Sequence, residues 1–193
     1  SSIDLSDYYL SDAESANTHY YNLPNGNSFW SASPNDFIVR FPENTMIESN
    51  ETIIIALSSQ AIFSNYYGDY YSDVSVFYLH DDMLDAHSQQ NTIGVSANLY
   101  DSYESLILFK WDENPNSLIE DVDYFYWGNP QGLALYGVDK TGILNYQDDT
   151  SFEIQAENIL DTHQSGEAYV RRSIIENGEN NPVDNLGFLG NGI

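Results

Sequence analysis

The feature that most constrains this chain is a pair of strand-forming runs separated by a turn-forming segment. Residues 105–111 and 118–128 are dense in aromatic, β-branched and large aliphatic side chains, whereas residues 112–117 contain Asp, Asn, Pro and Ser. Two such runs around a segment of this composition are typical of a β-hairpin with a longer loop. We therefore expect the rest of the fold to be built on this hairpin.

Regular alternation would divide the side chains of the second run between two faces. One face would carry Asp121, Asp123, Phe125 and Trp127, and the other Val122, Tyr124 and Tyr126. The aromatic end of the run requires a core, and the acidic end requires solvent, a cation or a hydrogen-bond donor.

The remaining segments predict an all-β fold with long loops. A helix is expected at residues 58–66, where a serine can cap its start and Gly68 can end it. The loop over residues 89–103 is expected to reach the core through Ile93, Val95 and Leu99. The strand at residues 52–57 is apolar on both faces and therefore expected at the centre of a sheet. Further strands are predicted at residues 3–10, 37–41, 74–79, 151–156 and 167–175, and long loops at residues 13–36 and 80–103.

About seven to nine short strands and one short helix suggest a single β-sandwich domain spanning residues 1–193. Residues 176–193 are rich in Asn and Gly, and we expect them to be partly mobile. The chain starts at Ser1 with neither Met nor a basic leader, so we interpret it as a mature or truncated fragment.

The charge balance narrows the classes of partner. The chain has thirty Asp and Glu residues but only five Lys and Arg residues, which gives a formal net charge of −25. Such a field repels nucleic acids and anionic membranes and favours cations, basic partners or simple solubility. The chain has no cysteine, which excludes disulfides, thiolate metal sites and cysteine nucleophiles. No apolar run approaches the roughly 20 residues of a membrane span.

Several segments resemble the lamin-tail domain family. Residues 3–12 contain an apolar residue, Asp-Leu-Ser, then Leu and Asp, similar to the family's signature. Weaker similarities lie at Phe41-Pro42 leading into the Ile run, at residues 122–128, and at Arg171-Arg172-Ser173, where Arg171 stands in place of the family's Gln. The resemblance implies an immunoglobulin-like β-sandwich, found in secreted or surface bacterial proteins as a non-catalytic interaction or anchoring module.

The chain departs from that family at its start. The family opens with a strand immediately before the Asp-Leu-Ser segment, and nothing precedes that segment here. We expect that strand to lie upstream, to be unresolved or to come from another chain, which would leave a vacant edge beside residues 3–10.

Two acidic clusters are candidate metal or catalytic sites. Asp121 and Asp123, if they share a face, could contribute to calcium binding or form the carboxylate pair of a glycoside hydrolase. A solvated strand end or a turn contact is the simpler interpretation. The second cluster, Asp81, Asp82 and Asp85 with His80 and His87, could bind a transition metal or simply form a polar loop.

Other polar residues form no recognisable catalytic set. His19 and His163 stand alone in polar segments, Lys140 lies in a turn-like stretch where a lone lysine is more often structural, and Asp148-Asp149 match no EF-hand. Arg171 and Arg172 are adjacent in a predicted strand, so one of them should point inward. That arginine would need a carboxylate as its partner. The tyrosine pairs Tyr66-Tyr67 and Tyr70-Tyr71 are a candidate sugar-stacking surface or part of the core.

We therefore predict a non-enzymatic extracellular or cell-surface module without catalytic, cofactor or metal-binding residues. Its partner would be a protein or a cell-surface glycan, with no nucleic acid and no membrane insertion. The alternative is a carbohydrate-binding module, with calcium as an optional stabiliser. A glycoside hydrolase using two carboxylates is the third interpretation.

Overall fold

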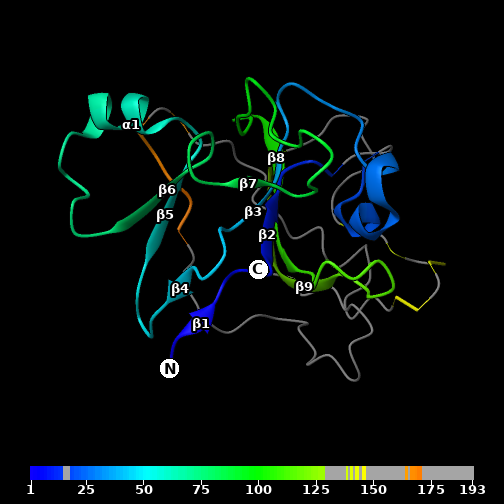
Figure 1. Cartoon of the computed structure of the whole chain (residues 1–193). Coiled ribbons are helices and arrows are strands. Elements are labelled where there is room, and N and C mark those ends of the chain that lie inside the picture. Colours follow the sequence, from blue (N-terminus) through cyan, green and yellow to red (C-terminus); the bar gives the residue numbers. More distant parts are fainter. Residues whose placement is uncertain are drawn as a thin grey trace.

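A computed structural model describes residues 1–14, 18–128, 138, 140, 142–143, 145–146, 164 and 166–170. The described chain is mostly β, with two short helices and no closed sheet (Figure 1). The predicted strands at residues 151–156 and 171–175, the tail at residues 176–193 and the Arg171-Arg172 pair lie outside the described residues. The described residues 167–170 form no strand.

The strands of the described chain form three sheets. A five-stranded antiparallel sheet has the order β7 (Leu84–Asp85), β3 (Ile38–Arg40), β2 (Tyr8–Ser11), β8 (Tyr103–Lys110) and β9 (Glu120–Gly128). A two-stranded antiparallel sheet pairs β1 (Ile3–Asp4) with β4 (Met46–Ile47). A two-stranded parallel sheet pairs β5 (Ile53–Ala56) with β6 (Ser75–Tyr78).

The predicted hairpin is confirmed as the antiparallel pair β8–β9. It forms one end of the five-stranded sheet, and β2 lies on its other side. Because β2 pairs with both β3 and β8, the expected vacant edge is absent beside residues 8–11. A turn at Ser6-Asp7 divides the predicted first strand into β1 and β2.

The predicted helix is also confirmed, as α1 (Gln60–Tyr67). The Ser59 hydroxyl accepts a hydrogen bond from the Ile62 N–H, and Gly68 ends the helix with φ 55°. This helix links the parallel strands β5 and β6, which need a crossover connection. The prediction that residues 52–57 form a central strand is wrong in the described part of the chain, where β5 pairs with β6 alone and only its Ala56 is buried.

A second helix was not predicted. The expected loop at residues 13–36 contains a 3-10 helix, η1 (Tyr20–Ser28), interrupted at Gly26. Its short tyrosine- and asparagine-rich sequence includes Pro24 and has little helical periodicity, so its position is set by packing rather than by propensity. Tyr20, Tyr21 and Leu23 of η1 are buried.

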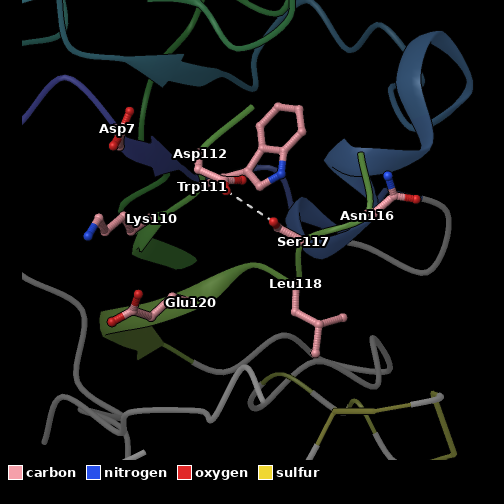
Figure 2. A pocket seen from close by; sticks show the side chains of 8 residues that line it. All are labelled: Asp7, Lys110, Trp111, Asp112, Asn116, Ser117, Leu118 and Glu120. Atoms are coloured by element: carbon pink, nitrogen blue, oxygen red, sulfur yellow. Dashed lines mark hydrogen bonds between the residues drawn. The ribbon is translucent and has the colours of Figure 1, made fainter. Parts of the chain in front are cut away.

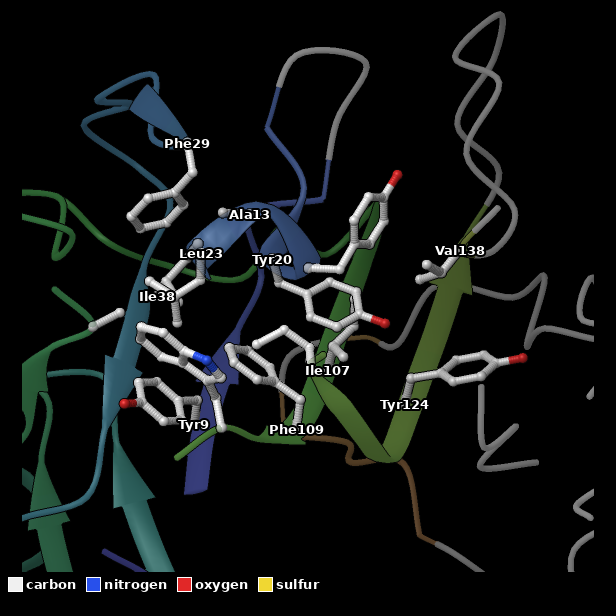
Figure 3. Packing of buried hydrophobic residues seen from close by; sticks show 14 residues of the cluster. Tyr9, Ala13, Tyr20, Leu23, Phe29, Ile38, Ile107, Phe109, Tyr124 and Val138 are labelled. Atoms are coloured by element: carbon white, nitrogen blue, oxygen red, sulfur yellow. The ribbon is translucent and has the colours of Figure 1, made fainter. Parts of the chain in front are cut away.

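Each face of the five-stranded sheet carries a hydrophobic cluster. Ile107 and Phe109 of β8 belong to the cluster under η1, which we call the η1-side cluster (Figure 3). The alternating residues Leu106 and Leu108 pack against the opposite cluster, which we call the β5-side cluster. The β5-side cluster also receives Ile47, Ile53, Ile55 and Phe77 from the small sheets, whereas Val95, predicted to reach the core, is 86% exposed.

Candidate functional site

A β-bulge in the hairpin separates the two aspartates that alternation had placed together. Leu108 pairs with Asp123, but the next residue of β8, Phe109, pairs with Asp121, so Val122 is an extra residue in β9. Because Leu108 and Phe109 point to opposite faces, Asp121 and Asp123 do so as well. The predicted shared face is therefore wrong, and with it the geometric basis for a carboxylate pair.

Asp121 faces the protein interior rather than solvent. Its side chain is 2% exposed. The Tyr20 hydroxyl donates to Asp121 Oδ1 at 2.6 Å, and Lys140 Nζ donates to Asp121 Oδ2 at 2.6 Å. The expectation of a solvated strand end is thus contradicted for Asp121.

The Lys140 ammonium lies in an aromatic enclosure. Its side chain is fully buried, and Nζ lies 4.5 Å from the ring centre of Tyr146, 5.0 Å from that of Tyr20 and 5.5 Å from that of Tyr21. Ring faces attract cations, so these contacts and the Asp121 carboxylate together offset part of the desolvation cost. Residues Asp121, Lys140, Tyr20, Tyr21 and Tyr146 are called the lysine cluster below.

Tyr146 of this cluster also bonds to the backbone of the hairpin. Burial raises the pKa of Tyr146 to about 12, and its hydroxyl accepts a hydrogen bond from the Ile119 N–H at 2.9 Å. The chain is held in place just before Lys140 as well, since Val138 is buried in the η1-side cluster (Figure 3). The lysine cluster is thus fixed by the same packing that forms the core.

A pair formed by a buried carboxyl group and a half-buried imidazole adjoins the lysine cluster. The Glu14 carboxylate contacts His19 Nδ1, and the His19 ring stacks on Tyr21 with 4.9 Å between centroids. Burial raises the pKa of Glu14, partly opposed by the nearby charges of His19 and Lys140. The hydrogen bond to Glu14 raises the pKa of His19. His19, expected to stand alone, therefore has a partner in the interior.

Three further acids with raised pKa values lie at another part of the sheet. Burial raises the pKa of Asp12 to about 9 and that of Glu104 to about 7, and it also raises the pKa of Asp36. Asp12 Oδ1 accepts a hydrogen bond from the Phe37 N–H at 2.5 Å. The sequence held no signal for these acids, because their burial follows from how residues 36 and 104 meet the end of β2.

A cavity of about 380 Å³ lies at the loop end of the hairpin (Figure 2). Asp112 at its rim accepts hydrogen bonds from Ser117 Oγ at 3.1 Å and from the Asn114 N–H at 3.0 Å. Trp111 Nε1 donates to the Asn114 carbonyl at 3.0 Å. These hydrogen bonds hold the loop in shape. The lining residues are Asp7, Lys110, Trp111, Asp112, Asn116, Ser117, Leu118 and Glu120.

The second predicted acidic cluster caps loops and a helix. Asp81 accepts a hydrogen bond of 2.6 Å from the Gln60 N–H, which lies at the start of α1. Asp82 accepts a hydrogen bond of 2.9 Å from the Tyr78 N–H. Asp85 accepts from the Thr92 N–H at 2.6 Å, and the imidazole of His87 accepts from the Gln89 N–H at 3.3 Å. Within the described chain, no three His, Asp or Glu side chains are arranged to hold a metal ion. His163 and Asp148-Asp149 lie outside the described residues.

An exposed aromatic surface covers the β5–α1–β6 unit. Helix α1 has no buried residue. Tyr66 is 78% exposed and Tyr70 81%, while Ile62 and Tyr67 are each more than half exposed. We call the surface formed by Ile62, Phe63, Tyr66, Tyr67, Tyr70 and Tyr71 the α1 aromatic face. Its rings are inclined to each other, by 42° for Phe63–Tyr67, 69° for Tyr67–Tyr71 and 80° for Tyr70–Tyr71.

The chain was compared with protein-family models, characterised proteins and solved structures, and none of them matches it. None of the helices that the structure describes is long and apolar enough to cross a membrane.

Proposed function

We propose that this chain is a non-catalytic interaction or anchoring module of a larger secreted or surface bacterial protein. The observation that carries the proposal is the α1 aromatic face, a set of exposed and half-exposed aromatic and aliphatic side chains on a helix without buried residues and on the turn that follows it. Exposed apolar patches of this kind mark interaction surfaces, and tyrosine supplies large contact area at low entropic cost.

The partner that fits this face is a basic protein segment. The rings are inclined rather than coplanar, so they form pockets for side chains and not a flat platform for a pyranose ring. The exposed acids Asp69 and Asp73 lie within the same stretch, and the whole chain carries a charge of −25. Aromatic rings combined with negative charge favour Lys and Arg side chains.

We further propose that the fold is an immunoglobulin-like β-sandwich of the lamin-tail type. Support comes from the β5-side cluster, where the five-stranded sheet and the residues of the two small sheets pack against each other. Two sheets packed face to face over one core are what a sandwich requires. The segments quoted for the resemblance supply β2, β5 and β9 of this arrangement.

A carbohydrate-binding role is the second candidate, and one observation favours it. The exposed rings of Tyr100 and Tyr103 lie 6.2 Å apart at an interplanar angle of only 25°. This pair comes closer to a flat stacking platform than does the α1 aromatic face.

A paired binding screen tests these candidates. The chain is screened against a random peptide library and a glycan array, together with the variants Tyr66→Ser/Tyr70→Ser and Tyr103→Ser. We expect selection of basic peptides, loss of binding in the double variant, retention in Tyr103→Ser, and weakening with salt. Glycan binding that depends on Tyr103 would favour the second candidate, and hydrolysis of any glycan would overturn the non-catalytic assignment.

A further inference from the structure

The lysine cluster brings an amine and a carboxyl group into a geometry suited to reaction. Lys140 Nζ lies 2.6 Å from Asp121 Oδ2, and the two side chains are 0% and 2% exposed. Reacting atoms held about 3–3.5 Å apart in a fixed orientation gain a large effective concentration. A nitrogen in contact with one carboxyl oxygen places the adjacent Cγ atom close to that range.

Burial favours the uncharged forms that such a reaction needs, and it acts against the attraction of the rings for the ammonium. Low-dielectric burial disfavours both an ammonium and a carboxylate, so transfer of one proton from the amine to the carboxyl relieves two buried charges. The aromatic walls exclude bulk water, which would otherwise favour hydrolysis. The Tyr20 hydroxyl, 2.6 Å from Asp121 Oδ1, is placed to stabilise negative charge that develops on that oxygen.

We propose that Lys140 and Asp121 condense to an intramolecular isopeptide bond. After proton transfer, the neutral amine Nζ attacks Cγ of the neutral carboxyl group. The Nζ–Cγ bond forms, the Cγ–Oδ2 bond breaks, and Oδ2 leaves as water with the proton it had gained and one proton from the amine. Oδ1 remains as the amide carbonyl, hydrogen-bonded to Tyr20, and no oxidant or cofactor is consumed.

Glu14 is the group placed to carry protons in this condensation. It is buried beside the cluster, paired with His19, and close enough for Lys140 to influence its titration. Burial raises its pKa, which favours the protonated form that a proton carrier needs. The bond would go beyond the proposed function, and it is independent of the α1 aromatic face.

The isopeptide bond would give this chain an intramolecular covalent cross-link, which it cannot form through disulfides. There is no cysteine, so disulfides cannot close any loop. An amide between residues 19 positions apart restricts the unfolded chain as a disulfide does, and it survives reducing agents.

Mass spectrometry of the purified full chain tests the proposal directly. We expect the intact mass to lie below the sequence mass by one water molecule. The chain has two lysines, so trypsin would normally release residues 111–140 as one peptide that contains both partners. A modified Lys140 blocks that cleavage, and the expected product is residues 111–171, lighter by one water and linked from Asp121 to Lys140.

Matched variants separate the bond from mere ion pairing. Lys140→Arg keeps a cation beside Asp121 but removes the nucleophilic amine, so this variant should fold, keep its full mass and melt at a lower temperature. Lys110→Met removes the other lysine, which lies opposite Glu120 on the sheet, and should retain the water loss. Asp121→Asn should still link, with loss of ammonia in place of water.

Two results would overturn these assignments. A folded wild-type chain at its full sequence mass, with trypsin cleaving after Lys140, would show that the cluster is only an ion pair. Full linkage in Glu14→Gln, measured by the same peptide, would remove Glu14 from the reaction, since we expect that variant to fold yet link slowly or not at all.

Discussion

The five-stranded sheet and the β5–α1–β6 unit are both rich in aromatic side chains, but the sheet buries them and the unit exposes them. In the sheet, Tyr9 and Phe109 are fully buried and stack on each other, and the buried Tyr20 of η1 packs on Phe109 with 5.0 Å between ring centroids. On α1, Tyr66 is largely exposed although its helix is well capped. Tyrosine content alone therefore does not distinguish a core from a binding surface; the decisive variable is whether another element covers the rings.

The largest expected difference between the two regions is in stability. Phe109→Ala removes a fully buried ring that stacks on Tyr9 with 5.1 Å between centroids, and should lower the free energy of unfolding by about 3–5 kcal/mol. The matched change Phe63→Ala on α1 removes a half-buried ring and should cost clearly less. Urea denaturation measures both, and equal losses would show that the α1 unit is as integral to the core as the sheet.

The second prediction concerns pH and the buried acids of the sheet. Folding raises the pKa of Asp12 from about 3.8 to about 9, so the folded state holds this proton more tightly. Its contribution to stability is fully present below pH 3.8 and is lost as pH rises toward 9, and the raised pKa of Glu104 adds to this loss up to about pH 7.

Asp12→Asn should keep the acceptor for the Phe37 N–H and remove the ionisation. We expect this variant to be more stable than the wild type at pH 8 by about 1–3 kcal/mol and nearly equal to it at pH 4. Thermal unfolding across this pH range measures the effect. Asp69→Asn, the same substitution at an exposed position in the other region, serves as the control. A wild-type stability that rises from pH 4 to pH 8 would contradict the assignment.

A helix-cap change probes how independently α1 folds. Ser59→Ala removes the acceptor for the Ile62 N–H and should destabilise the helix by about 0.5–2 kcal/mol. Because α1 buries no residue, the loss should appear as faster hydrogen exchange within residues 60–67, with little change for amides of β8 and β9. Faster exchange throughout the sheet would show that the two regions unfold as one unit.

The smallest expected stability change is at the centre of the proposed binding surface. Tyr66→Ser alters a ring that is 78% exposed, so the free energy of unfolding should stay within about 0.5 kcal/mol of the wild type. Calorimetric melting provides the measurement. A larger loss would mean that Tyr66 supports the fold, and the α1 aromatic face could then no longer be described as a surface reserved for a partner.

Local chemistry in the sequence was sufficient for the hairpin and for α1. Strand formers on both sides of residues 112–117 predicted β8 and β9, and Ser59 with Gly68 marked the helix ends. These features depend on neighbours in the chain. The two-sided apolar character of residues 53–56 was misleading, because contact with the β5-side cluster and with β6 explains it without a central position in a sheet.

The lysine cluster and η1 could not be predicted in the same way. Alternation assumed an unbroken ladder, and the extra residue Val122 reverses the face of Asp121 relative to Asp123. The partner of Asp121 lies 19 positions away at Lys140, and Tyr20 lies 101 positions away, so no local pattern connects them. The pairing of His19 with Glu14 is close in sequence, but its burial depends on how η1 packs.

The extra residue in β9 also has an evolutionary consequence. Deleting Val122 would restore an unbroken ladder in which Asp121 still lies opposite Phe109 and Asp123 still lies opposite Leu108. The two aspartates would then be direct neighbours on opposite faces, so gain or loss of this one codon is compatible with the lysine cluster. Related chains with and without this codon should therefore both keep a lysine at the position of Lys140.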